Sequence, residues 1–279
     1  MGYGIPTVAD EIGVSATADI IEARLPIAEY MLKTAGSMVV DTFHHTQRSM
    51  DYLKEVIKAI EALYIKNILQ SFPEDGILAS GGISHMESRN SIEWAVDPID
   101  GIHNFIRGIP EIGLQLAIRS QKELLYASMY QPFNQEQSTA TRGLGAVYHD
   151  YRTGQELNLS VSRRGLEEAL VIYDGSLGTS DAGELLDVLS KIGDKVGGTR
   201  VFGVAMQDFS MIASGRAEAF VTTVAHPEDV APGILLVREA GGRVTDLQGK
   251  EVDITSKSLL VSNGLVHDQI LELLNGGGA

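Results

Sequence analysis

The stretch Trp94-Ala95-Val96-Asp97-Pro98-Ile99-Asp100-Gly101 carries the most information about this chain. The apolar run at residues 92–96 predicts a buried strand, and it leads directly into two carboxylates three residues apart. Pro98 fixes one backbone angle and Gly101 permits a close bend, so both carboxylates can converge on one hard cation such as Mg²⁺. Asp-Pro and Asp-Gly are also ordinary turn residues, whose side chains cap backbone groups. The segment alone leaves a metal site and a structural turn as alternatives.

A second acidic segment, Pro227-Glu228-Asp229-Val230-Ala231-Pro232-Gly233, stands at the start of an apolar stretch that predicts a helix over residues 230–239. Asp229 falls at the N-terminus of this helix. A carboxylate there serves either as a helix cap, which stabilises by about 1 kcal/mol, or as a ligand brought to the first segment.

The remaining patterns divide the chain into two halves. Helical spacing of apolar residues predicts helices over residues 17–43, restarted near Pro26, and over 51–72, capped by Asp51. Alternating runs then predict strands, namely 113–119, 124–130, 137–141, 146–149 and 157–161. From about residue 165 strands and helices alternate. We therefore expect an α+β sub-domain at residues 1–160 that carries Asp97 and Asp100, and an α/β sub-domain at 161–279 that carries Asp229.

Composition excludes several classes of protein. The 279 residues include 22 Lys and Arg against 37 Asp and Glu, a net charge of −15 that repels a phosphate backbone, so no nucleic-acid partner is expected. The absence of Cys excludes disulfide scaffolds and thiolate metal sites. No basic and apolar leader and no apolar run of about 20 residues is present, which predicts a soluble, cytoplasmic protein without a membrane partner.

The two acidic segments, in this order and at this separation, resemble the inositol monophosphatase family of Mg²⁺-dependent phosphatases. Residues 94–105 are similar to the family's first motif, W-x-x-D-P-[ILV]-D-G-T-x-N-F, and residues 228–242 to its second motif, W-D-x-A-x-G followed by E-A-G-G. Weaker similarities are spread along the chain: residues 143–146, Gly154, 160–162 and 200–221. The resemblance covers nearly the whole chain and implies the family's layered αβαβα fold and its frequent homodimeric state.

By this resemblance one Mg²⁺ is held at Asp97, Ile99, Asp100 and Asp229. Three other family positions are replaced: Gly81 stands where a catalytic Glu is expected, Ile102 replaces the motif threonine, and Ile57 replaces an outer Asp. Neither isoleucine nor glycine can move a proton or supply an anionic ligand. The resemblance therefore implies one weakly held Mg²⁺, and phosphate-monoester hydrolysis that is weak or lost.

The positions that face the substrate in the family correspond to Gly101, Ile102, His103, Val204 and Glu228. Glu228 replaces the family's Trp and Val204 its Ser, so recognition of a polyol is in doubt. Three interpretations stay open: a repurposed enzyme acting on a small phosphorylated metabolite, a non-catalytic ligand- or protein-binding regulator, and an ordinary phosphomonoesterase in which Glu74 or Glu87 substitutes for the missing base.

Overall fold

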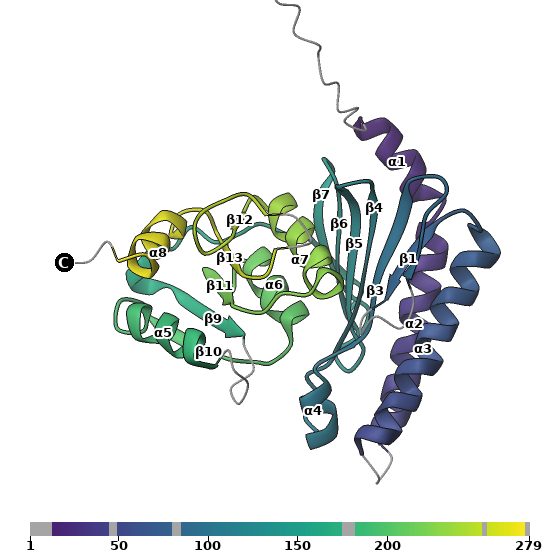
Figure 1. The fold of residues 1–279 in the computed structure, drawn as a ribbon, viewed down its shortest axis with the longest axis horizontal. Coiled ribbons are helices and arrows are strands. Elements are labelled where there is room, and N and C mark those ends of the chain that lie inside the picture. The colour runs from purple at the N-terminus through teal and green to yellow at the C-terminus, as the bar shows by residue number, and fades with distance from the viewer. Residues whose placement is uncertain (1–12, 45–48, 80–84, 175–181, 253–255, 277–279) are drawn as a thin grey trace, which may run out of the picture.

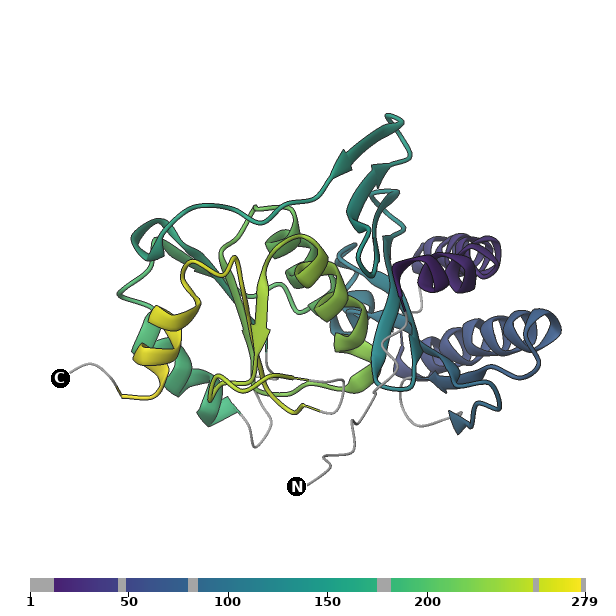
Figure 2. The same cartoon turned by 90° about the horizontal axis from the view of Figure 1, so that it is seen from above.

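The computed structural model describes residues 13–44, 49–79, 85–174, 182–252 and 256–276. In this part of the chain, helices and sheets alternate in five layers (Figure 1). The N-terminal helices cover an eight-stranded sheet, two helices follow, and a five-stranded sheet is covered on its far side by two more helices (Figure 2). This is the αβαβα fold that the resemblance implies, and both sheets are mixed.

The first layer consists of three helices that pack on one face of the first sheet. They are α1 (Val14–Glu22), α2 (Leu25–Phe43) and α3 (Met50–Ser71). Pro26 lies in the first turn of α2, so the expected restart of the helix at this proline is confirmed. Ser49, and not Asp51, caps α3, because its side chain accepts a hydrogen bond from the N–H of Tyr52.

The first sheet has the strand order β2-β1-β3-β4-β5-β6-β7-β8. The strands are β1 (Gly76–Ala79), β2 (His85–Met86), β3 (Ile92–Asp100), β4 (Gly113–Ser120), β5 (Glu123–Gln131), β6 (Glu136–Thr141), β7 (Gly145–Asp150) and β8 (Gln155–Asn158). β1 and β3 run parallel and the other neighbours antiparallel. β3 does not end at Val96 as expected; it continues to Asp100 with an irregular register after Asp97, and the short helix α4 (Ile102–Arg107) follows.

Two helices separate the sheets, α6 (Ala205–Ala213) and α7 (Pro227–Glu239). α7 packs on β3 to β7 and also contacts the second sheet, whereas α6 packs on α7. The two helices approach closely at Gly233, where an added Cβ would lie only 2.1 Å from Cγ of Phe209. His226, and not Asp229, is the cap residue of α7. Asp229 therefore lies inside the first turn.

The second sheet has the strand order β10-β9-β11-β13-β12. The remaining elements are β9 (Leu170–Asp174), α5 (Ala182–Ile192), β10 (Gly198–Arg200), β11 (Ala219–Thr222), β12 (Arg243–Thr245), β13 (Leu259–Ser262) and α8 (His267–Leu274). β9, β10 and β11 run parallel, so their carboxyl ends share one edge of the sheet. α5 and α8 cover the outer face.

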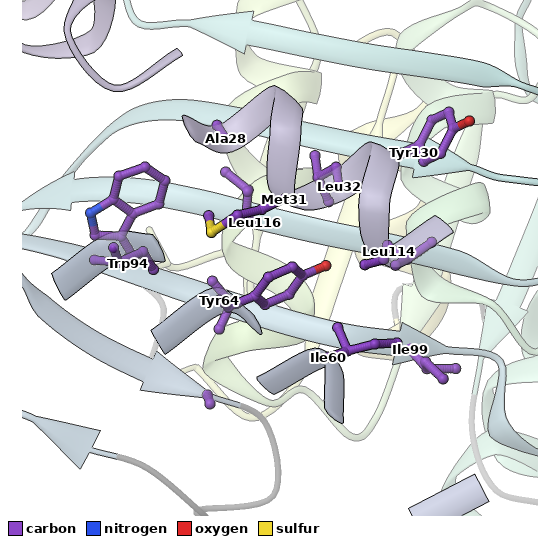
Figure 3. Close-up of a cluster of buried hydrophobic side chains, with 14 of the residues drawn as sticks. Ala28, Met31, Leu32, Ile60, Tyr64, Trp94, Ile99, Leu114, Leu116 and Tyr130 are labelled. Carbon is purple, nitrogen blue, oxygen red and sulfur yellow. The ribbon is translucent and has the colours of Figure 1, made fainter. Parts of the chain in front are cut away.

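The hydrophobic core between the first sheet and the N-terminal helices is shown in Figure 3. Met31 and Leu32 of α2 and Tyr64 of α3 lie against Trp94 of β3 and Leu116 of β4. All five side chains are fully buried. Across the described ranges, no helix has both the length and the apolar character needed to cross a bilayer.

Candidate functional site

Asp97 lies on the face of the first sheet that α7 covers. Val96 packs into the N-terminal core, so its neighbours Ala95 and Asp97 point to the opposite face of β3. Asp97 is 4% exposed. Its Oδ1 accepts a hydrogen bond from the N–H of Ile99 at 3.2 Å, and its Oδ2 accepts one from Nε2 of Gln115 at 3.2 Å. Because Gln115 is the direct partner of Asp97 in β4, the sheet register sets this contact.

Gln115 also joins the two acidic segments. Its Nε2 donates to the backbone carbonyl of Asp229 at 3.1 Å, across 114 residues of chain. Ala95, Ala117 and Ala231 pack together where α7 crosses β3 and β4. Their small side chains let the helix approach the sheet closely. The second acidic segment therefore lies beside the first, as its proposed role as a ligand requires.

Asp100 is tied to the start of α6. Its Oδ2 accepts a hydrogen bond from the N–H of Met206 at 2.8 Å. Gly113, opposite Asp100 in β4, leaves room for Met206, since an added Cβ would lie 2.1 Å from its Cε. Gly101 has φ of +92°, and an added Cβ there would lie 2.8 Å from the carbonyl oxygen of Glu111. Glycine is therefore required for the bend after Asp100.

The site concentrates negative charge. Burial, and then the charge of Asp97, raises the pKa of the Asp100 carboxyl well above its usual range, although the N–H of Met206 opposes this shift. Asp208 in α6 is fully buried, and neither of its carboxyl oxygens has a hydrogen-bond partner in the described structure. Burial, followed by the charges of Asp174 and Asp100, raises the pKa of Asp208 well above its usual range. The charged groups acting on these two carboxyls are all acidic.

The donor set fits one hard cation. Among the residues that the structure describes, no three acidic, histidine or cysteine side chains are gathered closely enough to hold a metal ion. Mg²⁺ in proteins, however, is commonly held by one or two carboxylates plus waters. Asp97 and Asp100 are two carboxylates that disfavour each other's charge, a repulsion that a divalent cation relieves. A single Mg²⁺ at this position is chemically reasonable.

The isoleucines at the replaced family positions belong to the hydrophobic core. Ile57 and Ile102 are both partly buried and pack against the cluster between the first sheet and the N-terminal helices. Gly81 lies outside the described residues. Glu74 and Glu87, the expected substitutes for the missing base, are both exposed, and the backbone carbonyl of Glu74 accepts a hydrogen bond from the N–H of Arg89.

The residues predicted to face the substrate differ in burial and in position. Val204 is fully buried beside Gly101, at the residue before α6. His103 in α4 is exposed. Glu228 lies in the first turn of α7. Ile99 is buried in the first core, and its N–H is used by Asp97. Val204 and Gly101 therefore share one wall of the site.

Several residues at or near the site were not predicted. Gln115 is a polar amide side chain in the middle of an apolar strand, and this pattern in the sequence indicates a residue with a role other than core packing. Glu61 lies one turn after Ile57 on the apolar side of α3; it is 3% exposed, and its Oε1 has no partner in the described structure. Burial and the charge of Asp97 raise the pKa of Glu61. α3 packs on the face of the sheet opposite to α7, so the charge of Asp97 acts on Glu61 across the sheet.

Comparison with known proteins agrees with this fold. The model of the inositol monophosphatase family matches residues 15–277, and the chain belongs to this family. It is 30% identical over 260 residues to fructose-1,6-bisphosphatase/inositol-1-monophosphatase of Thermotoga maritima, covering 90% of this chain and 96% of that protein. It is also 30% identical over 250 residues to Nus factor SuhB of Salmonella typhimurium, covering 86% of this chain and 91% of that protein.

Solved structures show the same architecture. The native crystal structure of extragenic suppressor protein suhB from Bartonella henselae matches with a TM-score of 0.83 and 28% sequence identity, covering 91% of this chain and 99% of that one. The family binds phosphorylated substrates and typically depends on Mg²⁺. This chain is a phosphatase-like member of it.

Proposed function

We propose that this protein holds one Mg²⁺ with the carboxylates of Asp97 and Asp100 and with waters, beside Asp229, and binds a small phosphorylated metabolite next to the ion. Hydrolysis of the phosphate ester by the family's usual route is weak or lost. The observation that carries the proposal is the double contact of Gln115, which fixes the carboxylate of Asp97 and the backbone of Asp229 at one place. The partly buried Asp100 lies in the same layer, between the two sheets.

When bound, Mg²⁺ polarises a phosphoryl oxygen and stabilises charge on the leaving group. The starts of α6 and α7 lie at the same edge, and the positive end of a helix dipole favours a phosphate. Gly101 and Val204 form a close-packed wall that limits where the substrate lies. Neither Ile57 nor Ile102 can accept a proton from water, so these two positions supply no base.

The proposal is tested by measuring cation binding and phosphate release separately. We expect one Mn²⁺ or Mg²⁺ to bind in titration calorimetry, binding to be lost in Asp97→Asn, and release of phosphate from inositol 1-phosphate to be negligible. Restoring the hydroxyl with Ile102→Thr is the matched variant, and it should not weaken cation binding. Turnover equal to that of an intact family member, abolished by Asp97→Asn, would contradict the loss of hydrolysis.

A regulatory role is the second candidate. Relatives that are 27–30% identical over most of the chain carry the name Nus factor SuhB or putative Nus factor SuhB. Such a role needs neither a bound cation nor turnover, so it is favoured if the same titration detects no cation binding. The expected absence of a nucleic-acid partner and the expected homodimer remain predictions; size-exclusion chromatography with light scattering tests the dimer.

A further inference from the structure

Asn104 joins three segments of the chain that are separate in the sequence. Its Nδ2 donates to the backbone carbonyl of Glu111 at 3.0 Å and to that of Phe202 at 3.2 Å. Asn104 belongs to α4, Glu111 to the loop before β4, and Phe202 to the segment before α6. The second contact spans 98 residues of chain. One amide group therefore fixes two backbone segments relative to α4.

Both segments form the wall that packs against Gly101. A Cβ added at Gly101 would lie 2.8 Å from the carbonyl oxygen of Glu111, which Asn104 holds, and 3.1 Å from Cγ2 of Val204. Gly203, which precedes Val204, has φ of +71°. Because glycine adopts a positive φ without steric cost, the chain can bend at this residue and place Val204 on Gly101.

The same backbone leads into the start of α6. Val204 is the residue before this helix, and the N–H of Met206 in its first turn donates to Oδ2 of Asp100 at 2.8 Å. The hydrogen bond from Asn104 to Phe202 therefore lies at the beginning of the short segment that ends at this contact. The positive end of the helix dipole favours a phosphate, so the placement of the first turn of α6 contributes to phosphate binding.

We propose that Asn104 is a positioning residue for the phosphate group of the substrate, which acts on the ligand by holding the start of α6 against Gly101. This inference rests on the proposed function. Removal of the amide leaves two backbone carbonyls without this donor, which is costly wherever water cannot replace it. The segment at residues 202–206 then loses its tie to α4, whereas Asp97 and Asp100 stay fixed by the pairing of β3 with β4. Phosphate binding should therefore weaken more than cation binding.

The test replaces Asn104 with two uncharged side chains. Asn104→Leu has a similar size and removes both hydrogen bonds, whereas Asn104→Ser keeps one donor. Inorganic phosphate, which cannot be turned over, is titrated by calorimetry in the presence of Mg²⁺, and Mn²⁺ is titrated alone. We expect the affinity for phosphate to fall about tenfold or more in Asn104→Leu and by less in Asn104→Ser. The affinity for Mn²⁺ should stay close to that of the wild type.

Hydrogen exchange gives a second measurement that needs no ligand. The N–H of Met206 should exchange faster in Asn104→Leu than in the wild type, because the segment that presents it to Asp100 opens more often.

Asn275→Leu is the matched control. Nδ2 of Asn275 also donates to two backbone carbonyls, those of Leu247 at 3.0 Å and Leu271 at 2.9 Å, at the end of α8. Its replacement should lower the Tm without changing the affinity for phosphate. A merely structural role of Asn104 would give this same result.

Phosphate affinity that is unchanged in Asn104→Leu, or that falls equally in Asn275→Leu, overturns the inference while the proposed function stands. An equal loss of Mn²⁺ and phosphate affinity also overturns it, because Asn104 then supports the whole site. If Asn104→Leu does not fold, Asn104→Ser decides by the same criteria. A wild type that binds Mn²⁺ but no phosphate refutes the proposed binding of a phosphorylated metabolite, and this inference with it.

Discussion

The buried ion pair between Arg24 and Asp75 supports the strand that carries the site, and its removal has a predictable cost. Asp75 receives hydrogen bonds from Nε and Nη2 of Arg24, both at 2.8 Å, from Nδ2 of Asn90 at 2.7 Å and from Nε1 of Trp94 at 2.8 Å. The Asp75 side chain is fully buried and that of Arg24 is 10% exposed. Asp75→Asn preserves the shape but leaves the guanidinium without its counter-charge.

We expect Asp75→Asn to lower the free energy of unfolding by about 3–5 kcal/mol, because breaking a buried pair leaves an uncompensated charge. At about 2–4 °C per kcal/mol for chains of roughly this size, the Tm falls by about 6–20 °C. The assay is urea unfolding followed by tryptophan fluorescence. Trp94 is the chain's sole tryptophan and donates directly to Asp75, so the signal reports on this region.

Lys58→Met is the matched control. It removes the ion pair between Lys58 and Glu55, in which the lysine side chain is 61% exposed and the glutamate side chain 72% exposed. Such exposed pairs contribute about 0–1 kcal/mol to stability. The double variant Arg24→Met with Asp75→Asn should recover part of the loss, since no unpaired charge then remains. The reasoning is refuted if Asp75→Asn and Lys58→Met lower stability by similar amounts below about 1 kcal/mol.

Three further predictions concern the site and the pH dependence. Gln115→Leu should weaken Mn²⁺ binding by about 10- to 100-fold in calorimetry, since groups that orient metal ligands have effects of this size; unchanged affinity contradicts the bridging role. Gly101→Ala should lower the Tm and cation affinity together, because φ is +92° and the new Cβ meets Glu111; Gly183→Ala, which meets nothing within 4 Å, is its control. Burial, aided by Arg243, lowers the pKa of His267 to about 4, so the stability contributed by neutral His267 is present above about pH 6.5 and is lost as the pH falls toward 4. Urea midpoints at pH 7.5, 5.5 and 4.5 should therefore decline in the wild type, and His267→Asn should flatten the decline.

Local patterns predicted most of the elements. Apolar periodicity placed α2, α3 and the central strands of the first sheet, because period and burial are properties of consecutive residues. The ends of the helices and strands were predicted less reliably than their positions. Ser49 caps α3 in place of Asp51. β3 continues to Asp100 because pairing with β4 holds the Asp97-Pro98 segment extended, although Asp-Pro by itself predicts a turn. α4 was not predicted, because its six residues are too few to show a periodic pattern.

The sequence by itself determined the family, the layered fold and the aspartates at positions 97, 100 and 229, since these rest on motifs written in consecutive residues. Only the tertiary structure decided that Gln115 bridges the two motifs, that Ile57 and Ile102 belong to a hydrophobic core, and that the charges of Asp174 and Asp100 act on the buried Asp208. These contacts join residues far apart in the chain. They depend on which faces of the sheets and helices meet, and no local pattern of residues specifies that.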